Sequence, residues 1–166
     1  MERTAVRWLT AEESVAWRGF LGAMRALERG ADRQLAECSG LSLADYQLLV
    51  PLSECDERAM RARDLGRHVN WERSRISHQL RRMEERGLIE RRDCPSDGRG
   101  TVVVLTRLGM RAIEQAAPSH VEWVRQNFVD LLSREEIELL GEICERVVRT
   151  VAGSCGATEA ASDGGS

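Results

Sequence analysis

The stretch from Met60 to Thr106 reads MRARDLGRHVNWERSRISHQLRRMEERGLIERRDCPSDGRGTVVVLT and carries the strongest structural signal in the chain. It contains two short helical patterns separated by a tight turn, the first at Ala62–His68 and the second rich in arginine. Two strand-like runs follow, Leu88–Asp93 and Thr101–Leu105, joined by a polar loop. This order of elements predicts a winged helix-turn-helix, in which one helix enters the major groove of DNA.

Positive charge is concentrated in the same part of the chain. Residues 58–99 contain twelve arginines and seven acidic residues, a net charge of +5, whereas the remaining residues carry a net charge of −8. A basic segment within an acidic chain is typical of a surface that binds a polyanion. The expected partner is therefore double-stranded DNA.

A set of motif residues runs through the arginine-rich helix and the two strands. They are Ser74, Ile76, Ser77, Leu80, Met83, Glu84, Gly87, Leu88, Ile89, Arg92, Asp97, Arg99, Thr101, Val104, Leu105, Thr106 and Gly109. On these residues the chain resembles the MarR family of bacterial transcriptional regulators, and the likeness extends over about residues 8–150. The resemblance implies two subunits with intertwined terminal helices and two winged lobes one helical turn of DNA apart. One departure is Gly98, where the family's wing usually has the first of two adjacent arginines.

Composition bounds the class of protein. The 166 residues, 42% of them apolar, suffice for one domain with a modest core. No apolar run approaches the roughly 18 residues of a membrane span, and the N-terminus lacks the apolar segment of a signal peptide. We therefore expect a cytoplasmic protein without membrane contact. The five cysteines are widely spaced and include no CxxC motif, so we expect reduced thiols and neither a metal nor another cofactor.

Helical patterns flank the winged segment on both sides. Capping boxes at Thr10 and Ser42 begin two helices, the second of which is expected to kink or end near Pro51. After the wing, a helix from Thr106 is expected to be interrupted at Pro118. The tail 153–166 is small and polar, and we expect it to be disordered.

The expected fold is mainly α with a small β-wing, a winged helix-turn-helix with N- and C-terminal dimerisation helices. Residues 1–152 would form a single MarR-like domain, with a DNA-binding lobe at about 42–106 and dimerisation helices at about 11–38 and 119–152. The apolar stripes of the terminal helices exceed what a small lobe can cover. A homodimer that binds a palindromic site is therefore expected.

The arginine-rich helix has two distinct faces. Ile76, Leu80 and Met83 share one stripe and are expected to face the core. The groove-facing candidates are Asn70, Trp71, Arg73, Ser74, Arg75, Ser77, His78, Arg81 and Arg82. Ser74, Arg75, Ser77 and His78 are expected at base edges, Arg81 and Arg82 on phosphates, and Asn70 as the N-cap. The alternative for such a face is a charged helix surface that is simply solvated.

The wing loop offers a second contact with DNA. Arg99 at its tip can reach the minor groove, where a narrow groove favours a guanidinium group. Asp97 is expected to support the wing by orienting an arginine, because phosphate repels a carboxylate. A surface ion pair without a role is the alternative for Asp97.

Regulators that resemble this chain usually respond to a small molecule or to oxidation. Candidates for binding an aromatic, phenol-like ligand are Trp17, Met24, Tyr46, His120 and Trp123. Each can instead have a packing role in the core or the dimer. Cys94, at the foot of the wing, is the thiol whose oxidation would most affect DNA binding.

These observations predict a sequence-specific DNA-binding regulator. The expected form is a repressor that binds its operator as a homodimer and is released by a small aromatic ligand. The alternatives are a thiol-oxidation-responsive regulator and a winged-helix module that binds protein or RNA. An enzyme is not expected, because the sequence shows no nucleophile with a base, phosphate loop or metal cluster at a usable spacing.

Overall fold

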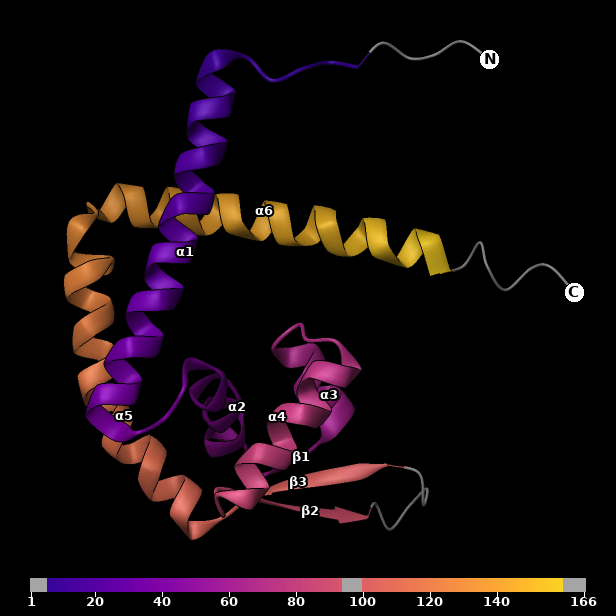
Figure 1. Cartoon of the computed structure of the whole chain (residues 1–166). Helices are drawn as coiled ribbons and strands as arrows, with labels where there is room; N and C mark the ends of the chain where they lie inside the picture. Colours follow the sequence, from indigo (N-terminus) through magenta and orange to yellow (C-terminus); the bar gives the residue numbers. More distant parts are fainter. Residues whose placement is uncertain (1–5, 94–99, 160–166) are drawn as a thin grey trace, which may run out of the picture. The chain divides into compact units, whose positions relative to one another are not determined.

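The computed structural model describes residues 6–93 and 100–159, with side chains up to Val151 (Figure 1). The elements are α1 (Ala11–Ser39), α2 (Leu43–Glu54), β1 (Ala59–Arg61), α3 (Ala62–His68), α4 (Arg73–Glu85), β2 (Ile89–Asp93), β3 (Thr101–Leu105), α5 (Arg107–Asn127), the 3-10 turn η1 (Val129–Leu131) and α6 (Arg134–Glu159). The expected fold, mainly helical with a small wing, is confirmed. The chain forms two compact units, one up to Trp123 and one from Val124 onward. No helix in the described part of the chain is long and apolar enough to cross a membrane.

Reciprocal capping starts both N-terminal helices. The Thr10 hydroxyl accepts the Glu13 N–H at 3.1 Å, while the Glu13 carboxylate accepts the Thr10 N–H at 2.8 Å. Ser42 and Asp45 form the same arrangement at the start of α2. Gly40 ends α1 with a φ of 68°, a conformation that favours glycine. The sequence therefore predicted these boundaries within a residue or two.

The two internal prolines do not end their helices, so the predicted interruption at Pro118 and the predicted end near Pro51 were wrong, while the alternative of a kink at Pro51 stays a prediction. α2 continues through Pro51 to Glu54, and α5 continues through Pro118 to Asn127. The Pro51 ring is buried in the core, and its carbonyl still accepts the Cys55 N–H at 3.2 Å. A proline removes only one helical hydrogen bond, so favourable packing around the helix can keep the helix continuous.

The turn between α3 and α4 corrects the prediction for Asn70. Asn70 has a φ of 53° and follows the end of α3, while α4 begins only at Arg73. The Asn70 N–H donates to the Arg67 carbonyl, and the Trp71 N–H donates to the Gly66 carbonyl at 2.9 Å. This pair of hydrogen bonds is a Schellman motif. Asn70 therefore terminates α3 and is not the N-cap of α4, because asparagine tolerates the left-handed conformation that this turn requires.

The wing is a three-stranded antiparallel sheet in the order β1-β3-β2 (Figure 1). Val104 of β3 pairs with Ala59 of β1 on one side and with Glu90 of β2 on the other. Sequence analysis found β2 and β3 but missed β1. The three residues of β1 are too few to show an alternating pattern.

The hydrophobic core is formed by side chains from the five helices α1, α2, α3, α4 and α5 and from the sheet. It consists of Leu35, Leu41, Leu48, Leu49, Leu52, Leu65, Ile76, Leu80, Met83, Leu88, Ile89, Val103, Leu105, Ile113 and Ala116. Ile76, Leu80 and Met83 are at most 4% exposed, as their spacing predicted. The opposite face of α4 is therefore left to the outside.

The C-terminal helix is longer than expected. The sequence predicts an end near residue 152, whereas α6 continues to Glu159. No proline interrupts residues 153–159, so each further residue can add a helical hydrogen bond. The rest of the tail predicted to be disordered, 160–166, lies outside the described residues.

Candidate nucleic-acid interface

The face of α4 opposite its core residues carries the predicted DNA-reading side chains. Arg73, Ser74, Arg75, Ser77, His78, Arg81 and Arg82 are all exposed. All of them lie on α4, which begins at Arg73, so the structure brings them together on one surface. Asn70 is also exposed and Trp71 is half-buried, and both lie in the turn that precedes α4.

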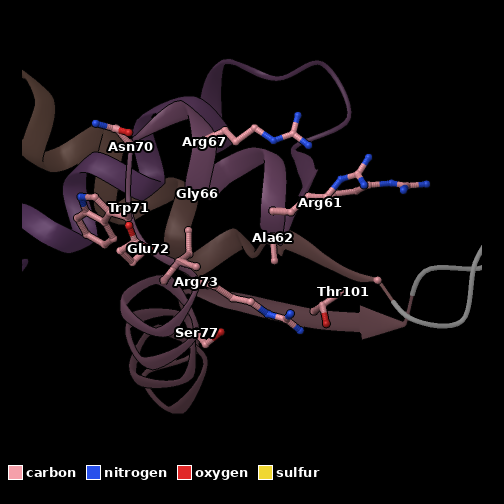
Figure 2. A pocket seen from close by; sticks show the side chains of 13 residues that line it. Arg61, Ala62, Gly66, Arg67, Asn70, Trp71, Glu72, Arg73, Ser77 and Thr101 are labelled. Atoms are coloured by element: carbon pink, nitrogen blue, oxygen red, sulfur yellow. The ribbon is translucent and has the colours of Figure 1, made fainter. Parts of the chain in front are cut away.

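A concavity of about 590 Å³ lies between α3, the start of α4 and the start of β3. Four arginines line it, namely Arg61, Arg63, Arg67 and Arg73, together with Asn70, Trp71, Glu72, Ser77 and Thr101. Figure 2 shows the Arg61, Arg67 and Arg73 side chains directed away from Trp71, toward the Thr101 end of the concavity. Four guanidinium groups against one carboxylate make this surface suitable for an anion.

Sequence analysis missed Arg61, Arg63 and Arg67 as candidate site residues. Arg61 ends β1 and reaches the concavity because β1 pairs with β3, whereas Arg63 and Arg67 reach it from α3, which packs against α4. Arg63 and Arg67 each lie 3.4 Å from the Asp64 carboxylate, at exposed positions. The net positive charge of residues 58–99 includes them, and that is the sequence signal that could have identified them.

Trp71 and Arg75 form a direct contact at the N-terminal end of α4. The Arg75 guanidinium carbon lies 3.9 Å from the centroid of the Trp71 ring. This is the geometry of a cation–π interaction, in which the positive charge lies over the aromatic face. The α3–α4 turn thus positions a ring beneath an exposed arginine of the reading helix.

Glu84 anchors the reading helix to the wing. Its carboxylate accepts the Arg91 backbone N–H at 3.0 Å and the Arg91 Nε–H at 2.8 Å. The hydrogen bond from the Arg91 side chain lowers the pKa of Glu84 below its usual 4.5. The carboxylate is therefore ionised at neutral pH and connects α4 to β2.

A buried carboxylate supports α4 from the other side. Asp45 is 1% exposed, and it accepts hydrogen bonds from Ser42, Gln79 and Arg86. Burial raises the pKa of Asp45. The hydrogen bonds from Ser42 and Arg86 and the positive charge of Arg86 together outweigh this effect, so the pKa lies below its usual 3.8. Arg86 also donates to the Gly40 carbonyl at 2.8 Å. The end of α4 is thereby connected to the α1–α2 corner.

The wing tip cannot be placed in this interface. Arg99, Asp97 and Cys94 lie outside the described residues. β3 begins beside the basic concavity, since Gly100 and Thr101 line it, and Asp93 at the end of β2 pairs with Thr101. The roles of Arg99 and Asp97 therefore stay predictions.

The structure brings three of the five ligand candidates together. The Tyr46 and His120 rings are 4.4 Å apart, and the His120 and Trp123 rings are stacked at 6.2 Å. Burial lowers the pKa of His120, and His120 Nδ1 lies 3.1 Å from Gln34 Oε1. A second concavity of about 400 Å³ is lined by Leu43, Tyr46, Gln47, Val50, Pro51, His68, Val69 and His120.

Trp17 and Met24 do not join this group. Both side chains are exposed, and the Trp17 ring stacks on Phe20 at 6.1 Å. Trp123 lies against Gly30 of α1. At 1.5 Å per residue, Trp17 is about 20 Å further along the helix. Trp17 and Met24 lie on the apolar stripe of α1, and the sequence does not show which part of this long helix packs against Trp123.

Comparison with known proteins identifies the family. Residues 41–101 match the MarR family model. The chain is 40% identical to the MarR family transcriptional regulator Sco3205 from Streptomyces coelicolor, whose structure was solved in complex with DNA. The match covers 89% of this chain and 92% of that one, with a TM-score of 0.86. The chain belongs to the MarR family.

Two further relatives agree with this assignment. AbsC, a MarR family transcriptional regulator from S. coelicolor, is 38% identical, with 89% of this chain and 99% of that chain covered and a TM-score of 0.84. The HTH-type transcriptional regulator YdgJ of Bacillus subtilis is 30% identical over 66% of this chain, and the match spans 65% of its length. The protein is thus a DNA-binding transcriptional regulator of the MarR family and not an enzyme. The exposed face of α4 and the basic concavity are its candidate DNA interface.

Proposed function

We propose that this MarR family member is a homodimeric repressor that reads a palindromic operator with α4 and is released by a small aromatic ligand. The observation that carries the proposal is the exposed face of α4 beside a concavity lined by four arginines. Arginine suits both phosphate and guanine, since its planar guanidinium group donates bidentate hydrogen bonds.

The two parts of this surface have different roles. Ser74, Arg75, Ser77 and His78 lie in the N-terminal half of α4, the half that enters the groove deepest in helix-turn-helix complexes, and they read base edges. Phosphates are held by Arg81 and Arg82 and by the concavity residues Arg61, Arg67 and Arg73. Asn70 and Trp71 lie beside them, in the turn before α4. On the wing, Arg99 enters the minor groove and Asp97 orients it.

Exposed apolar side chains on both units support a second copy as partner. On α1, Trp17, Phe20 and Met24 are 42–52% exposed. On α6, Ile143 and Val147 are 37% and 52% exposed. Exposed apolar stripes at helical spacing are typical of interaction surfaces. A copy of the same chain supplies matching stripes under two-fold symmetry, and a two-fold dimer reads a palindrome.

The second concavity supports an aromatic effector. Tyr46 and His120 provide ring faces, and Leu43, Val50 and Val69 provide apolar contacts. Burial raises the pKa of Tyr46, so its hydroxyl stays protonated and can donate a hydrogen bond. A mostly apolar cleft with a few polar groups suits a compound with one or two aromatic rings.

The chain offers a direct route from this cleft to the DNA surface. His68 and Val69, at the end of α3, line the second concavity, while the next two residues, Asn70 and Trp71, line the basic one. A ligand that displaces the end of α3 therefore displaces the turn that leads into α4. Release requires only that the ligand prefer the displaced state, and coupling of this kind typically amounts to about 5- to 150-fold in affinity.

The test begins with selection of duplexes from a random pool by the purified protein. We expect enrichment of an inverted repeat, and release of that DNA by members of a panel of phenolic compounds in a gel shift. Tyr46→Ala should abolish release while leaving DNA affinity in the absence of compound within about twofold.

Other outcomes favour other functions. A pool without an enriched sequence would overturn the proposal and favour a module that binds protein or RNA. Release by peroxide that dithiothreitol reverses, with no response to any phenolic compound, would favour a thiol-responsive regulator.

A further inference from the structure

Trp71 contacts both the α3 cap and the core at the entrance to α4. Its N–H donates to the Gly66 carbonyl as the last hydrogen bond of the α3 cap, and its half-buried ring packs against the core. An indole has only two side-chain torsions, so packing against the core restricts the ring while the hydrogen bond places its backbone. Figure 2 shows Trp71 at the end of the basic concavity opposite Thr101.

Arg75 is the residue that this ring meets. Its guanidinium carbon lies 3.9 Å above the ring centroid, while the side chain is exposed on the reading face of α4. A cation–π contact uses the positive charge of the guanidinium group and leaves N–H donors along its edge available. That edge is the part of arginine that donates to O6 and N7 of guanine in the major groove.

The contact with Trp71 also restricts the Arg75 side chain before DNA binds. A free arginine side chain loses much torsional freedom when it docks on a base, and this loss weakens binding. A ring that already restricts the side chain removes part of that loss before DNA arrives. By contrast, Arg81 faces Glu85, at 3.8 Å and at exposed positions, a contact that orders a side chain little.

We propose that Trp71 is a positioning residue that holds Arg75 for reading a guanine in each half-site, so that Trp71 determines sequence discrimination without itself reading a base. The proposal rests on the DNA-reading role assigned to α4 above. It gives the half-turn between α3 and α4 a part in specificity, and it names guanine as the base opposite Arg75.

The experiment is a double-mutant cycle on DNA binding. Wild type, Trp71→Leu, Arg75→Ala and the double variant are titrated at one salt concentration against the selected operator and against random duplex. Arg75→Ala should weaken operator binding about 5- to 100-fold. Trp71→Leu should weaken it about two- to fivefold, the size of a cation–π contact, and should change random-duplex binding less than twofold. In the Arg75→Ala background, Trp71→Leu should have no further effect on operator binding.

Two more variants separate positioning from folding. Arg75→Lys keeps the charge but loses the planar edge, so it should lose operator affinity and retain affinity for random duplex. Trp71→Phe keeps an aromatic face and should restore most of the operator affinity lost in Trp71→Leu. Replacing each half-site guanine by 7-deazaguanine removes the N7 acceptor, and it should weaken wild type more than it weakens Arg75→Ala.

The contrary results are distinct. Additive losses in the cycle, equal losses on both DNAs, or no recovery with Trp71→Phe would overturn the positioning role even though an operator is bound. A wild-type protein that selects no sequence would overturn both this role and the function on which it rests.

Discussion

Arg86, at the end of the reading helix, donates a 2.6 Å hydrogen bond to the buried carboxylate of Asp45 on α2. Gln79, one of the two buried polar residues of the described chain, donates to the other oxygen of the same carboxylate at 2.7 Å. Two contacts from one helix to one fixed acceptor define both the rotation and the position of that helix. The orientation of α4 therefore depends on a polar network beneath it as well as on Ile76, Leu80 and Met83.

Replacement of Asp45 by asparagine should destabilise the protein. The change removes the charge that Arg86 and Gln79 share and leaves donors with poorer acceptors, at a cost of about 2–3 kcal/mol in the free energy of unfolding. Urea unfolding followed by circular dichroism measures it. Asp56→Asn is the matched control, because Asp56 is exposed, and it should change stability by less than about 0.5 kcal/mol.

The same network gives a pH dependence of defined sign. The pKa of Asp45 is lowered in the folded protein, so its contribution is fully present above the unfolded value near 3.8 and is lost as pH falls toward the folded value. The stability difference between wild type and Asp45→Asn should therefore be constant from pH 5 to 7 and should shrink below about pH 4. A difference that grew on acidification would contradict the assigned protonation state.

Two buried glycines should respond in opposite ways to alanine. A Cβ at Gly109 would lie 2.1 Å from the Leu88 carbonyl oxygen, which is backbone and cannot move aside, so Gly109→Ala should cost several kcal/mol or prevent folding. At Gly66 a Cβ would meet its neighbours at 3.5 Å or more, an ordinary contact. Gly66→Ala should therefore be neutral or stabilise by up to about 1 kcal/mol. Thermal unfolding of both variants checks the packing around the start of α5, and similar losses for the two would contradict it.

The reading face should separate specificity from affinity. Ser74→Ala and His78→Ala should each reduce the preference for the operator over random duplex by about 1–3 kcal/mol, because they remove base contacts. Arg82→Ala should weaken both DNAs about equally, because it removes a phosphate contact. Arg29→Ala, an exposed arginine on α1, is the control and should affect neither. Equal losses on both DNAs for Ser74, His78 and Arg82 would show that a different face of α4 meets the bases.

The sequence predicted those features that depend on local pattern. α3 at Ala62–His68, the two long wing strands, the capping boxes and the core face of α4 all follow from residue spacing and were found. The predictions of a helix end at Pro51, an interruption at Pro118 and an N-cap at Asn70 failed for a common reason. Each depended on what the surrounding fold tolerates, namely a helix retained by packing or a left-handed turn closed by α3.

The candidate site was predicted only in part, for a related reason. The residues on α4 lie on one helix, so periodicity groups them without knowledge of the fold. Arg61 joins them through the pairing of β1 with β3, a contact between segments about 40 residues apart, and Arg67 joins them through the packing of α3 against α4. The Asp45–Gln79–Arg86 network is likewise long-range, and its residues show no pattern in the sequence. Trp17, Tyr46 and His120 lie on three different helices, and the sequence does not show which of these helices come together at which residues.

Association should depend on the exposed stripe of α6. Val147 is an apolar side chain that is 52% exposed in the single chain. Val147→Glu should disrupt the dimer, because association would bury an unpaired charge at this position. Leu140→Glu, at a half-buried position, should also lower stability. Arg149→Glu lies on the same helix about 200° away from Val147 and is the control. Light scattering over a dilution series should give a dimer for wild type and Arg149→Glu and a monomer for Val147→Glu, whereas a wild-type monomer at all concentrations would contradict the assembly.

The most direct test of the account is a hydroxyl-radical footprint of the wild-type protein on its selected DNA. Two copies of α4 in successive major grooves should protect two symmetric sets of sugars. The half-site centres should be about 10–10.5 base pairs apart, and the two half-sites should form an inverted repeat. At a protein concentration that just saturates with wild type, Arg75→Ala should weaken protection of both half-sites together. A single, asymmetric protected segment, or protection that does not follow the sequence, would contradict a symmetric pair of reading helices.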